Sequence, residues 1–362
     1  MATYEIQSAR PAPSNLRGPF HWMKENLFAT PADIIQTIVI FLFLFWIIPP
    51  FLDWALFDAS FVGTTKADAT GTGANWIYVK EKMDMFIYGF YPEEEIYRVN
   101  IVFGLFFVTV ILFKFVARTF KQQAFIFLIY PLIAFVLIKG GYFGFTDIST
   151  DKWGGLLLTL IIASVGIVLS LPLGTILALG RQSELPIIKN LSVLYIEFIR
   201  GVPIITMLFM GSVLLPLFFV DGVEVDKLLR ALIVIIMIES AFIAEAVRGG
   251  LQSIPKGQYE AADSLGLGYW QKMIFVILPQ ALKVALPNLV GISIELFKDT
   301  SLVMIIGLFD ILSMVHLTAN DSNWLGMETE GYVFVTFVYW IICYAMSKYS
   351  MILEDRFNTN NR

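Results

Sequence analysis

Two carboxylates lie deep inside long apolar segments of the sequence. Glu239 stands nine residues before Arg248, and Glu295 stands twelve residues after Lys283. Along a helix these separations correspond to roughly 13 and 18 Å. An acidic side chain at the centre of a membrane helix costs about 2.5–3.5 kcal/mol, so it usually marks a pathway, a ligand or a structural pair. A carboxylate at such a depth can receive an ammonium group. The structural alternatives are a helical pair of Glu295 with Lys298 and a hydrogen bond to Glu239 from a neighbouring helix.

The composition assigns the chain to a lipid bilayer. Of its 362 residues, 57% are hydrophobic and 15% are charged, and the mean hydropathy is +0.73. A soluble fold does not need so much apolar surface for its core. The net charge of −5, without a block of Lys and Arg, gives no basic field, so nucleic acid is not expected as a partner.

Metal and disulfide chemistry find no support in the sequence. Cys343 is the single cysteine, which excludes a disulfide framework and a multi-cysteine metal site. His21 and His316 have no partner at a metal-ligand spacing. We therefore predict no metal site and no cofactor in this chain.

Eight segments come close to the roughly 20 apolar residues that a spanning helix needs. Four contain no Asp, Glu, Lys or Arg, namely 34–52, 122–138, 153–180 and 331–347. Four carry a few charges, which indicates burial against other helices or a cavity, namely 99–118, 194–219, 229–248 and 284–309. We predict an all-α integral membrane protein with about eight transmembrane helices.

Basic residues in the connections predict the orientation, because Lys and Arg are retained on the cytoplasmic side. They form five groups, which fall at the two termini and in every second connection: Arg10, Arg17 and Lys24; Lys114, Arg118 and Lys121; Arg181 and Lys189; Arg248, Lys256 and Lys272; Lys348, Arg356 and Arg362. With eight crossings, both termini and the loop 249–283 are cytoplasmic. The loop 53–98 is then extracytoplasmic, and its acidic residues outnumber its basic ones.

The chain divides near residue 150. Residues 1–150 hold three predicted helices with Phe-rich faces and no polar constellation that suggests chemistry, so we interpret them as a scaffold facing lipid. Residues 151–362 hold the other five predicted helices and all the informative patterns.

The loop 249–283 is a polar helix-turn-helix between apolar segments. Pro255 can begin a helix that runs to about Leu265, and Gly266 suits its left-handed end. A second helix can occupy Leu267–Leu278 until Pro279 stops or bends it. A connection of some 30 residues with this order is usually functional, although an ordinary surface loop is the alternative.

One side of this loop predicts a docking surface. Ala261, Ala262 and Gly266 leave that side shallow, while Tyr259 and Leu265 offer apolar contacts. Such a surface suits a helix lying in the groove of a soluble partner.

The same loop resembles the EAA loop of ABC importer permeases. The residues that carry this resemblance are Glu260, Ala261, Ala262, Gly266, Val276, Leu278 and Pro279. Further stretches resemble the polar amino-acid subfamily of these permeases: Leu158–Leu160, Glu197–Pro203, Ala244–Gly250, Gln252–Gln258, Leu278–Ala281 and Lys298–Leu302. Together the similarity covers about residues 153–355. The three additional N-terminal helices are similar to the longer design of M-type permeases in general L-amino-acid importers.

The resemblance implies a fold and a set of partners. Residues 151–362 would form the five-helix, MetI-like core of a permease in the bacterial inner membrane, with the coupling loop at 249–283. The chain would be one transmembrane half-pore, surrounded by membrane lipid, that imports L-amino acids. Its partners would be a second homologous permease subunit, an ABC ATPase dimer and an extracytoplasmic amino-acid-binding protein. ATP and Mg²⁺ would be bound by the ATPase, because this chain has no phosphate-binding Gly-x-x-x-x-Gly-Lys-Ser/Thr loop.

The resemblance also implies roles for particular residues. ATPase coupling would fall to Tyr259, Glu260, Ala261, Ala262, Ser264, Leu265 and Gly266. The depth of Glu239 and Glu295, and not the resemblance, predicts that one or both receive the ammonium group of an amino acid in transit, since the related permeases more often carry an Asn-like residue at these positions. A structural or interface role would fall to Pro279, Lys298 and Asp299.

Four other charged residues are predicted to form structural pairs. These pairs are Glu245 with Arg248 and Glu197 with Arg200.

Two other classes of function compete with this interpretation. An ion-coupled secondary amino-acid transporter could also use intramembrane carboxylates, but it would not need the docking loop. A membrane enzyme would need a catalytic constellation, and no Ser-His-carboxylate set at helical spacing is present.

Overall fold

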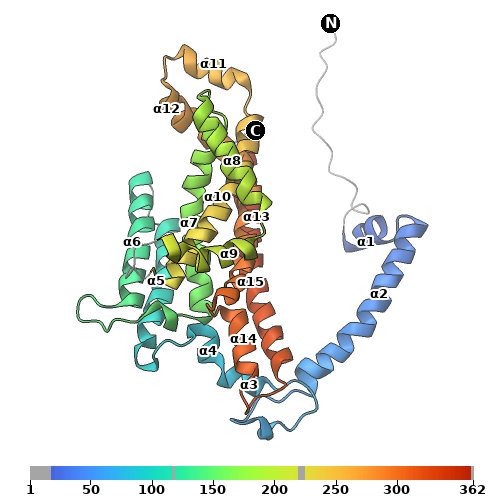
Figure 1. Ribbon diagram of the computed structural model, residues 1–362. Coiled ribbons are helices and arrows are strands. Elements are labelled where there is room, and N and C mark those ends of the chain that lie inside the picture. The colour runs from blue at the N-terminus through green and yellow to red at the C-terminus, as the bar shows by residue number, and fades with distance from the viewer. Residues whose placement is uncertain (1–17, 116–118, 219–224, 360–362) are drawn as a thin grey trace. The chain divides into compact units, whose positions relative to one another are not determined.

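The computed structural model describes residues 18–115, 119–218 and 225–359 (Figure 1). The chain forms two compact units, Met1–Ile77 and Tyr78–Arg362. Arg10, Arg17, Arg118 and Arg362, which contribute to the predicted orientation, lie outside the described residues. The predicted domain boundary near residue 150 and the orientation itself stay predictions.

The first unit is built on one long apolar helix. The helices are α1 (Pro19–Leu27) and α2 (Pro31–Leu52), and α2 continues into a π-helical turn at Asp53–Phe57. Thr30 and Asp33 form a reciprocal capping box that fixes the start of α2. Thr37 is the one buried residue of α2, so its apolar side chains face outward, as a lipid-facing helix requires.

The second unit begins with two short helices and two long ones. It contains α4 (Met83–Tyr88), α5 (Ile96–Phe115) and α6 (Phe120–Lys139), while α3 (Trp76–Glu81) crosses the unit boundary. The Tyr78 hydroxyl lies 2.6 Å from that of Thr318, and Lys82 donates to Asp321 at 2.7 Å. This hydrogen bond holds the pKa of Asp321 below its usual value. The end of the predicted 53–98 loop is therefore helical and attached to the C-terminal half of the chain.

The C-terminal half consists of long helices around α10. In chain order they are α7 (Gly155–Arg181), α8 (Pro186–Gly201), α9 (Ile204–Val213), α10 (Lys227–Ser253), α11 (Lys256–Ser264), α12 (Tyr269–Lys272), α13 (Leu278–Asp299), α14 (Ile311–Ala319) and α15 (Glu328–Thr359). Helix α10 contacts α7, α8, α9 and α13. Helices α11 and α12 lie at one end of this unit, and α4 and α14 lie at the other (Figure 1).

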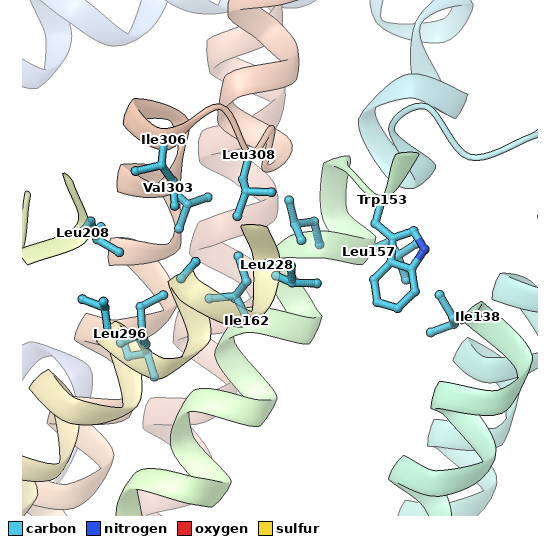
Figure 2. Close-up of a cluster of buried hydrophobic side chains, with 14 of the residues drawn as sticks. Ile138, Trp153, Leu157, Ile162, Leu208, Leu228, Leu296, Val303, Ile306 and Leu308 are labelled. Carbon is cyan, nitrogen blue, oxygen red and sulfur yellow. The ribbon is translucent and has the colours of Figure 1, made fainter. Parts of the chain in front are cut away.

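The core has a large apolar cluster and a smaller one. Figure 2 shows the larger cluster, in which Leu296, Val303 and Ile306 pack with Ile162 of α7. The smaller cluster joins α7, α8, α10 and α13 near the α11 end, with Ala178, Ile196, Val247 and Ala281 among its members.

The described residues contain six helices long and apolar enough to cross a membrane, or up to seven if a bent pair is counted as one span. The bent pair is α8 and α9, which meet at 103°. The prediction of a single helix over 194–219 is therefore wrong at Val202 and Pro203. A proline disfavours helical backbone in the residue before it, and Val202 is extended.

Pro279 does not stop the helix that precedes it. Helical backbone runs from Tyr269 to Ile306, with a π-helical turn at Met273–Ile277 just before Pro279. Proline lacks an N–H and its ring clashes with the carbonyl four residues earlier, and a wider turn removes both conflicts. The coupling loop is therefore continuous with α13.

Glycines let α10 approach its neighbours closely. A Cβ added at Gly174 of α7 would lie 2.7 Å from the Ser240 carbonyl oxygen, and one at Gly250 would lie 2.3 Å from that of Ala281. By contrast, a Cβ at Gly249 would meet nothing within 4 Å.

We expect Gly250→Ala to destabilise the protein by about 1–3 kcal/mol, because the added methyl group would push α10 away from α13. The matched control is Gly249→Ala, which should be neutral or slightly stabilising because alanine favours the helix by up to about 1 kcal/mol. Thermal melting of the detergent-purified transporter compares the two variants. Equal melting temperatures would contradict the close helix contact.

Candidate functional site

Three carboxylates gather where α10 faces α13. Glu239 of α10 is only 4% exposed. Glu295 and Asp299 of α13 lie near enough for their charges to repel that of Glu239. Asp299 is half-buried and Glu295 is exposed. The structure thus brings both predicted substrate residues, together with Asp299, into one acidic cluster, defined here as Glu239, Glu295 and Asp299.

The described contacts support neither structural alternative, that is, neither a hydrogen bond to Glu239 nor a helical pair of Glu295 with Lys298. None of the described residues donates a hydrogen bond to the Glu239 carboxylate, although the side chain is buried. Within the same described part of the chain, Glu295 and Lys298 form no ion pair within 4.0 Å. A buried carboxylate without a donor is costly and commonly indicates a functional group awaiting a partner.

Lys298 adds one positive charge beside the acidic cluster. Its charge acts on Asp299, and its side chain is exposed. Lys298 lies fifteen residues after Lys283, which corresponds to roughly 22 Å along a helix. A lysine exposed at that depth faces another subunit or a water-filled path more readily than lipid.

The coupling loop forms the expected two short helices joined by a glycine turn. Gly266 has φ +73°, the left-handed conformation that glycine adopts without strain. Its N–H donates to the Asp263 carbonyl at 2.9 Å, and that of Leu267 donates to Ala262 at 3.2 Å. Asp263 also pairs with Lys272 at 2.6 Å, which fastens α11 to α12.

The two faces of α11 have different roles. Glu260, Ala261, Ser264 and Leu265 are exposed, and Leu265 is 78% exposed. In contrast, Ala262 is 2% exposed. Ala262 therefore does not lie on the exposed face of α11, and its predicted role in ATPase coupling stays a prediction.

Tyr259 also belongs mainly to the inner face of α11. It is half-buried and packs on the smaller apolar cluster. Its hydroxyl donates to the Leu251 carbonyl at 3.5 Å, and burial raises the pKa of that hydroxyl. Tyr259 packs on the apolar cluster shared by α10, α13 and the turn Met273–Ile277, and Ala262 is buried, so neither residue presents a freely exposed apolar contact.

Sequence reasoning missed an ionic network at the same end of the helices. Glu245 of α10 is 16% exposed and contacts Arg181 of α7 at 2.5 Å. It also contacts Arg248 at 2.7 Å and Arg200 of α8 at 3.7 Å. The predicted Glu245–Arg248 pair is confirmed.

Glu197 and Arg200 do not form the predicted helical pair. Glu197 pairs instead with Arg181 at 3.0 Å, while Arg200 reaches Glu245. The missing signal was Arg181, which is distant in sequence and enters the network only because α7 packs against α10.

Comparisons with known proteins agree with this architecture. Residues 170–358 match the family described as "Binding-protein-dependent transport system inner membrane component". The chain is 51% identical to the inner membrane amino-acid ABC transporter permease YhdY of Escherichia coli, over 97% of this chain and 96% of that protein. It is 36% identical to the glutamate/glutamine/aspartate/asparagine transport system permease BztC of Rhodobacter capsulatus, over 99% of this chain and 98% of that protein. It is 34% identical to the probable amino-acid ABC transporter permease YckA of Bacillus subtilis, over 55% of this chain and 85% of that protein.

A multi-helix membrane chain with a polar coupling loop and this similarity defines an ABC importer permease. The chain belongs to the binding-protein-dependent inner-membrane transport family and is the permease subunit of an amino-acid ABC importer. It is a multi-pass protein of the inner membrane. Its class works with a binding protein, and ATP is bound and hydrolysed by a separate ATPase subunit. The predictions of an amino-acid permease and of an all-helical membrane fold are confirmed.

We expect Ala261→Arg and Ala262→Arg to fail in different ways. Ala261 is exposed, so Ala261→Arg should leave the melting temperature unchanged and reduce recovery of the ATPase in a pull-down. Ala262 is buried, so Ala262→Arg should lower the melting temperature, because an arginine at this position has no space and no partner. Normal ATPase recovery with Ala261→Arg would contradict the assignment of the exposed face.

Proposed function

We propose that this chain is the M-type permease of a general L-amino-acid importer. In this proposal it pairs with a second homologous permease subunit above an ABC ATPase dimer, and an extracytoplasmic amino-acid-binding protein delivers the substrate. The support comes from relatives that match almost the whole chain, including its N-terminal part, and whose names specify amino-acid transport. The shorter relative matches 55% of the chain, which agrees with an extension added to a common core.

The substrate site of this half-pore is the acidic cluster on α10 and α13. The observation that carries this proposal is Glu239, a carboxylate that is 4% exposed and accepts no hydrogen bond from any described residue. An ammonium group offers three donors and a compensating charge, so it satisfies what the helices leave unsatisfied.

The balance of charge favours a cationic group at this site. The acidic cluster holds three carboxylates, and the ammonium group of Lys298 acts on one of them, that of Asp299. The α-ammonium group is common to all L-amino acids, whereas their side chains differ. A site that selects this group therefore suits an importer with a broad range of substrates. Lys298 and Asp299 would lie at the interface of the two permease halves, where a partner subunit shields the exposed lysine from lipid.

The coupling loop connects the ATPase to this site. The exposed face of α11, formed by Glu260, Ala261, Ser264 and Leu265, would contact the ATPase, with the glycine turn at Gly266 setting its angle. The inner face of α11 is packed on α10 and α13. These two helices carry the acidic cluster, so movement of α11 would be transmitted to both as a rigid-body shift.

We expect Glu239→Gln and Glu295→Gln to raise the KM for amino-acid uptake about 10- to 100-fold, because each removes a charge-assisted contact worth about 1.5–3 kcal/mol. Uptake into proteoliposomes with several amino acids measures this effect. The matched control is Glu184→Gln in the exposed turn between α7 and α8, which should leave KM unchanged.

Unchanged KM values for all substrates in both variants would reject the acidic cluster as the substrate site. The same proteoliposomes distinguish the importer from a secondary transporter. Import should require the ATPase and internal ATP and should continue after the proton gradient is collapsed.

A further inference from the structure

A second buried carboxylate lies just beyond the acidic cluster. Asp310 is fully buried and caps the start of α14. Its carboxylate accepts hydrogen bonds from the backbone N–H of Ser313 at 2.9 Å and of Leu312 at 3.3 Å, and from the Ser313 hydroxyl. Among the described residues, no cation lies within ion-pair distance of Asp310. Its charge is therefore stabilised by hydrogen bonds, and each donor matters.

Tyr339 links this carboxylate to the end of α13. Its hydroxyl donates to Asp310 Oδ2 at 2.9 Å and lies 3.4 Å from the Thr300 hydroxyl. Thr300 is fully buried, and its hydroxyl can donate to the Phe297 carbonyl at 2.8 Å. The Tyr339 ring packs on that of Phe297 with centroids 5.2 Å apart. A single side chain of α15 thus holds both the α14 cap and the last turn of α13.

Helix α7 contributes to the same network. The backbone N–H of Ile311 donates to the buried hydroxyl of Thr159 at 3.2 Å, and the N–H of Gly155 donates to the Phe309 carbonyl at 2.9 Å. Elements from α7, α13, α14 and α15 therefore meet at one polar point inside the apolar core. Val303 and Ile306 of the 3-10 turn Thr300–Ile306, which follows α13, belong to the larger apolar cluster (Figure 2).

The position of this network relates it to the acidic cluster. Thr300 directly follows Asp299 and stands five residues after Glu295. Within the part of the chain that the structure describes, Tyr339 is the hydrogen-bond donor to Asp310 that comes from a different helix. Hydrogen bonds to a carboxylate are stronger than neutral ones, so this contact resists displacement of α15 from the start of α14. The contact of the same hydroxyl with Thr300 extends the hold to the end of α13.

We propose that Asp310, Tyr339 and Thr300 form a positioning network that holds the last turn of α13 so that Glu295 and Asp299 face Glu239. The inference rests on the proposed substrate site. Tyr339 is a positioning residue, because it acts through Thr300 and Asp310 and does not contact the substrate.

The network should affect substrate affinity more than ATPase coupling. Thr300 lies 22 residues beyond Leu278, which is roughly 33 Å along the helix from the coupling loop. Loss of the Tyr339 hydroxyl should therefore raise KM about tenfold and leave basal ATP hydrolysis unchanged. Tyr339→Phe removes the hydroxyl and keeps the ring against Phe297.

The experiment compares Tyr339→Phe with Tyr332→Phe in the complete transporter in proteoliposomes. Tyr332 lies two turns earlier on α15 and also makes one hydroxyl contact, with His316 at 3.1 Å. Its variant should keep the original KM. Thr300→Val removes the other hydroxyl of the network and should raise KM as Tyr339→Phe does. Thr300→Ser retains the hydroxyl and should keep the original KM.

Cys343 supplies a readout that does not depend on transport. It is half-buried on α15, one turn after Tyr339, and Lys298 of α13 lies near enough for its charge to act on the thiol. If α13 is released, maleimide should alkylate Cys343 faster in Tyr339→Phe than in Tyr332→Phe, as measured by mass spectrometry of its peptide.

The possible outcomes separate this inference from the proposed function. A raised KM together with faster alkylation in Tyr339→Phe supports the network. An unchanged KM in Tyr339→Phe, while Glu239→Gln raises it, overturns the network and leaves the substrate site standing. If Glu239→Gln, Glu295→Gln and Tyr339→Phe all leave KM unchanged, both the site and its positioning network are rejected. Tyr339→Phe could also lose assembly or basal ATP hydrolysis. If it does, and if Thr300→Val keeps assembly, basal ATP hydrolysis and the original KM, the inference is overturned as well.

Discussion

Charge inside an apolar environment is the constraint on which this protein depends. Helix α10 carries Arg230, Glu239, Glu245 and Arg248, and lipid can solvate none of them. The helix is accordingly surrounded by α7, α8, α9 and α13, and close contact at Gly174 and Gly250 allows its neighbours to pack tightly. The position of α10 at the centre of the core follows from the cost of exposing these side chains to lipid.

Three carboxylates of the second unit are stabilised in different ways. Glu245 is neutralised by arginines from three helices, which stabilises the end near the coupling loop. Asp310 has no arginine in the described structure but accepts several hydrogen bonds, which fix the opposite end. Glu239, between them along the helices, has neither. Glu245 and Asp310 hold the two ends of the helices, while Glu239 between them has no hydrogen-bond donor or cation among the described residues. This arrangement suits a carboxylate that must bind a cation and release it again.

Sequence reasoning predicted the long helices and the polar helix-turn-helix, because hydrophobic length and the glycine and proline signals are local properties. The class came from the resemblance of several motifs to ABC importer permeases. Sequence reasoning also placed Glu239 and Glu295 at similar depth. It failed where the answer depends on a neighbouring helix. Ala261 and Ala262 are the same residue type, so the sequence does not distinguish them. Which of the two faces outward is decided by the packing of α11 on the neighbouring helices.

The prolines show a second limit of sequence reasoning. Pro203 begins a new helix at a sharp bend, whereas Pro279 lies within helical backbone that continues. Both residues lack an N–H, and the local sequence does not say which solution the surrounding structure will stabilise. The network around Asp310 was equally invisible, because Thr159, Thr300 and Tyr339 come from three distant segments and look like ordinary residues of apolar helices.

The wide turn at Met273–Ile277 has a consequence for the lengths that this segment can tolerate. Successive residues of a helix are rotated by about 100° about its axis. The π-helical turn holds one residue more than a regular turn. Removing one residue there would convert it to a regular turn and would leave the rest of α13 facing the same way relative to α11. Removing a residue further along α13 would instead rotate Glu295 by about 100° to a different side of the bundle while the docking face stayed in place. A single-residue deletion is therefore better tolerated at this turn than elsewhere in the segment.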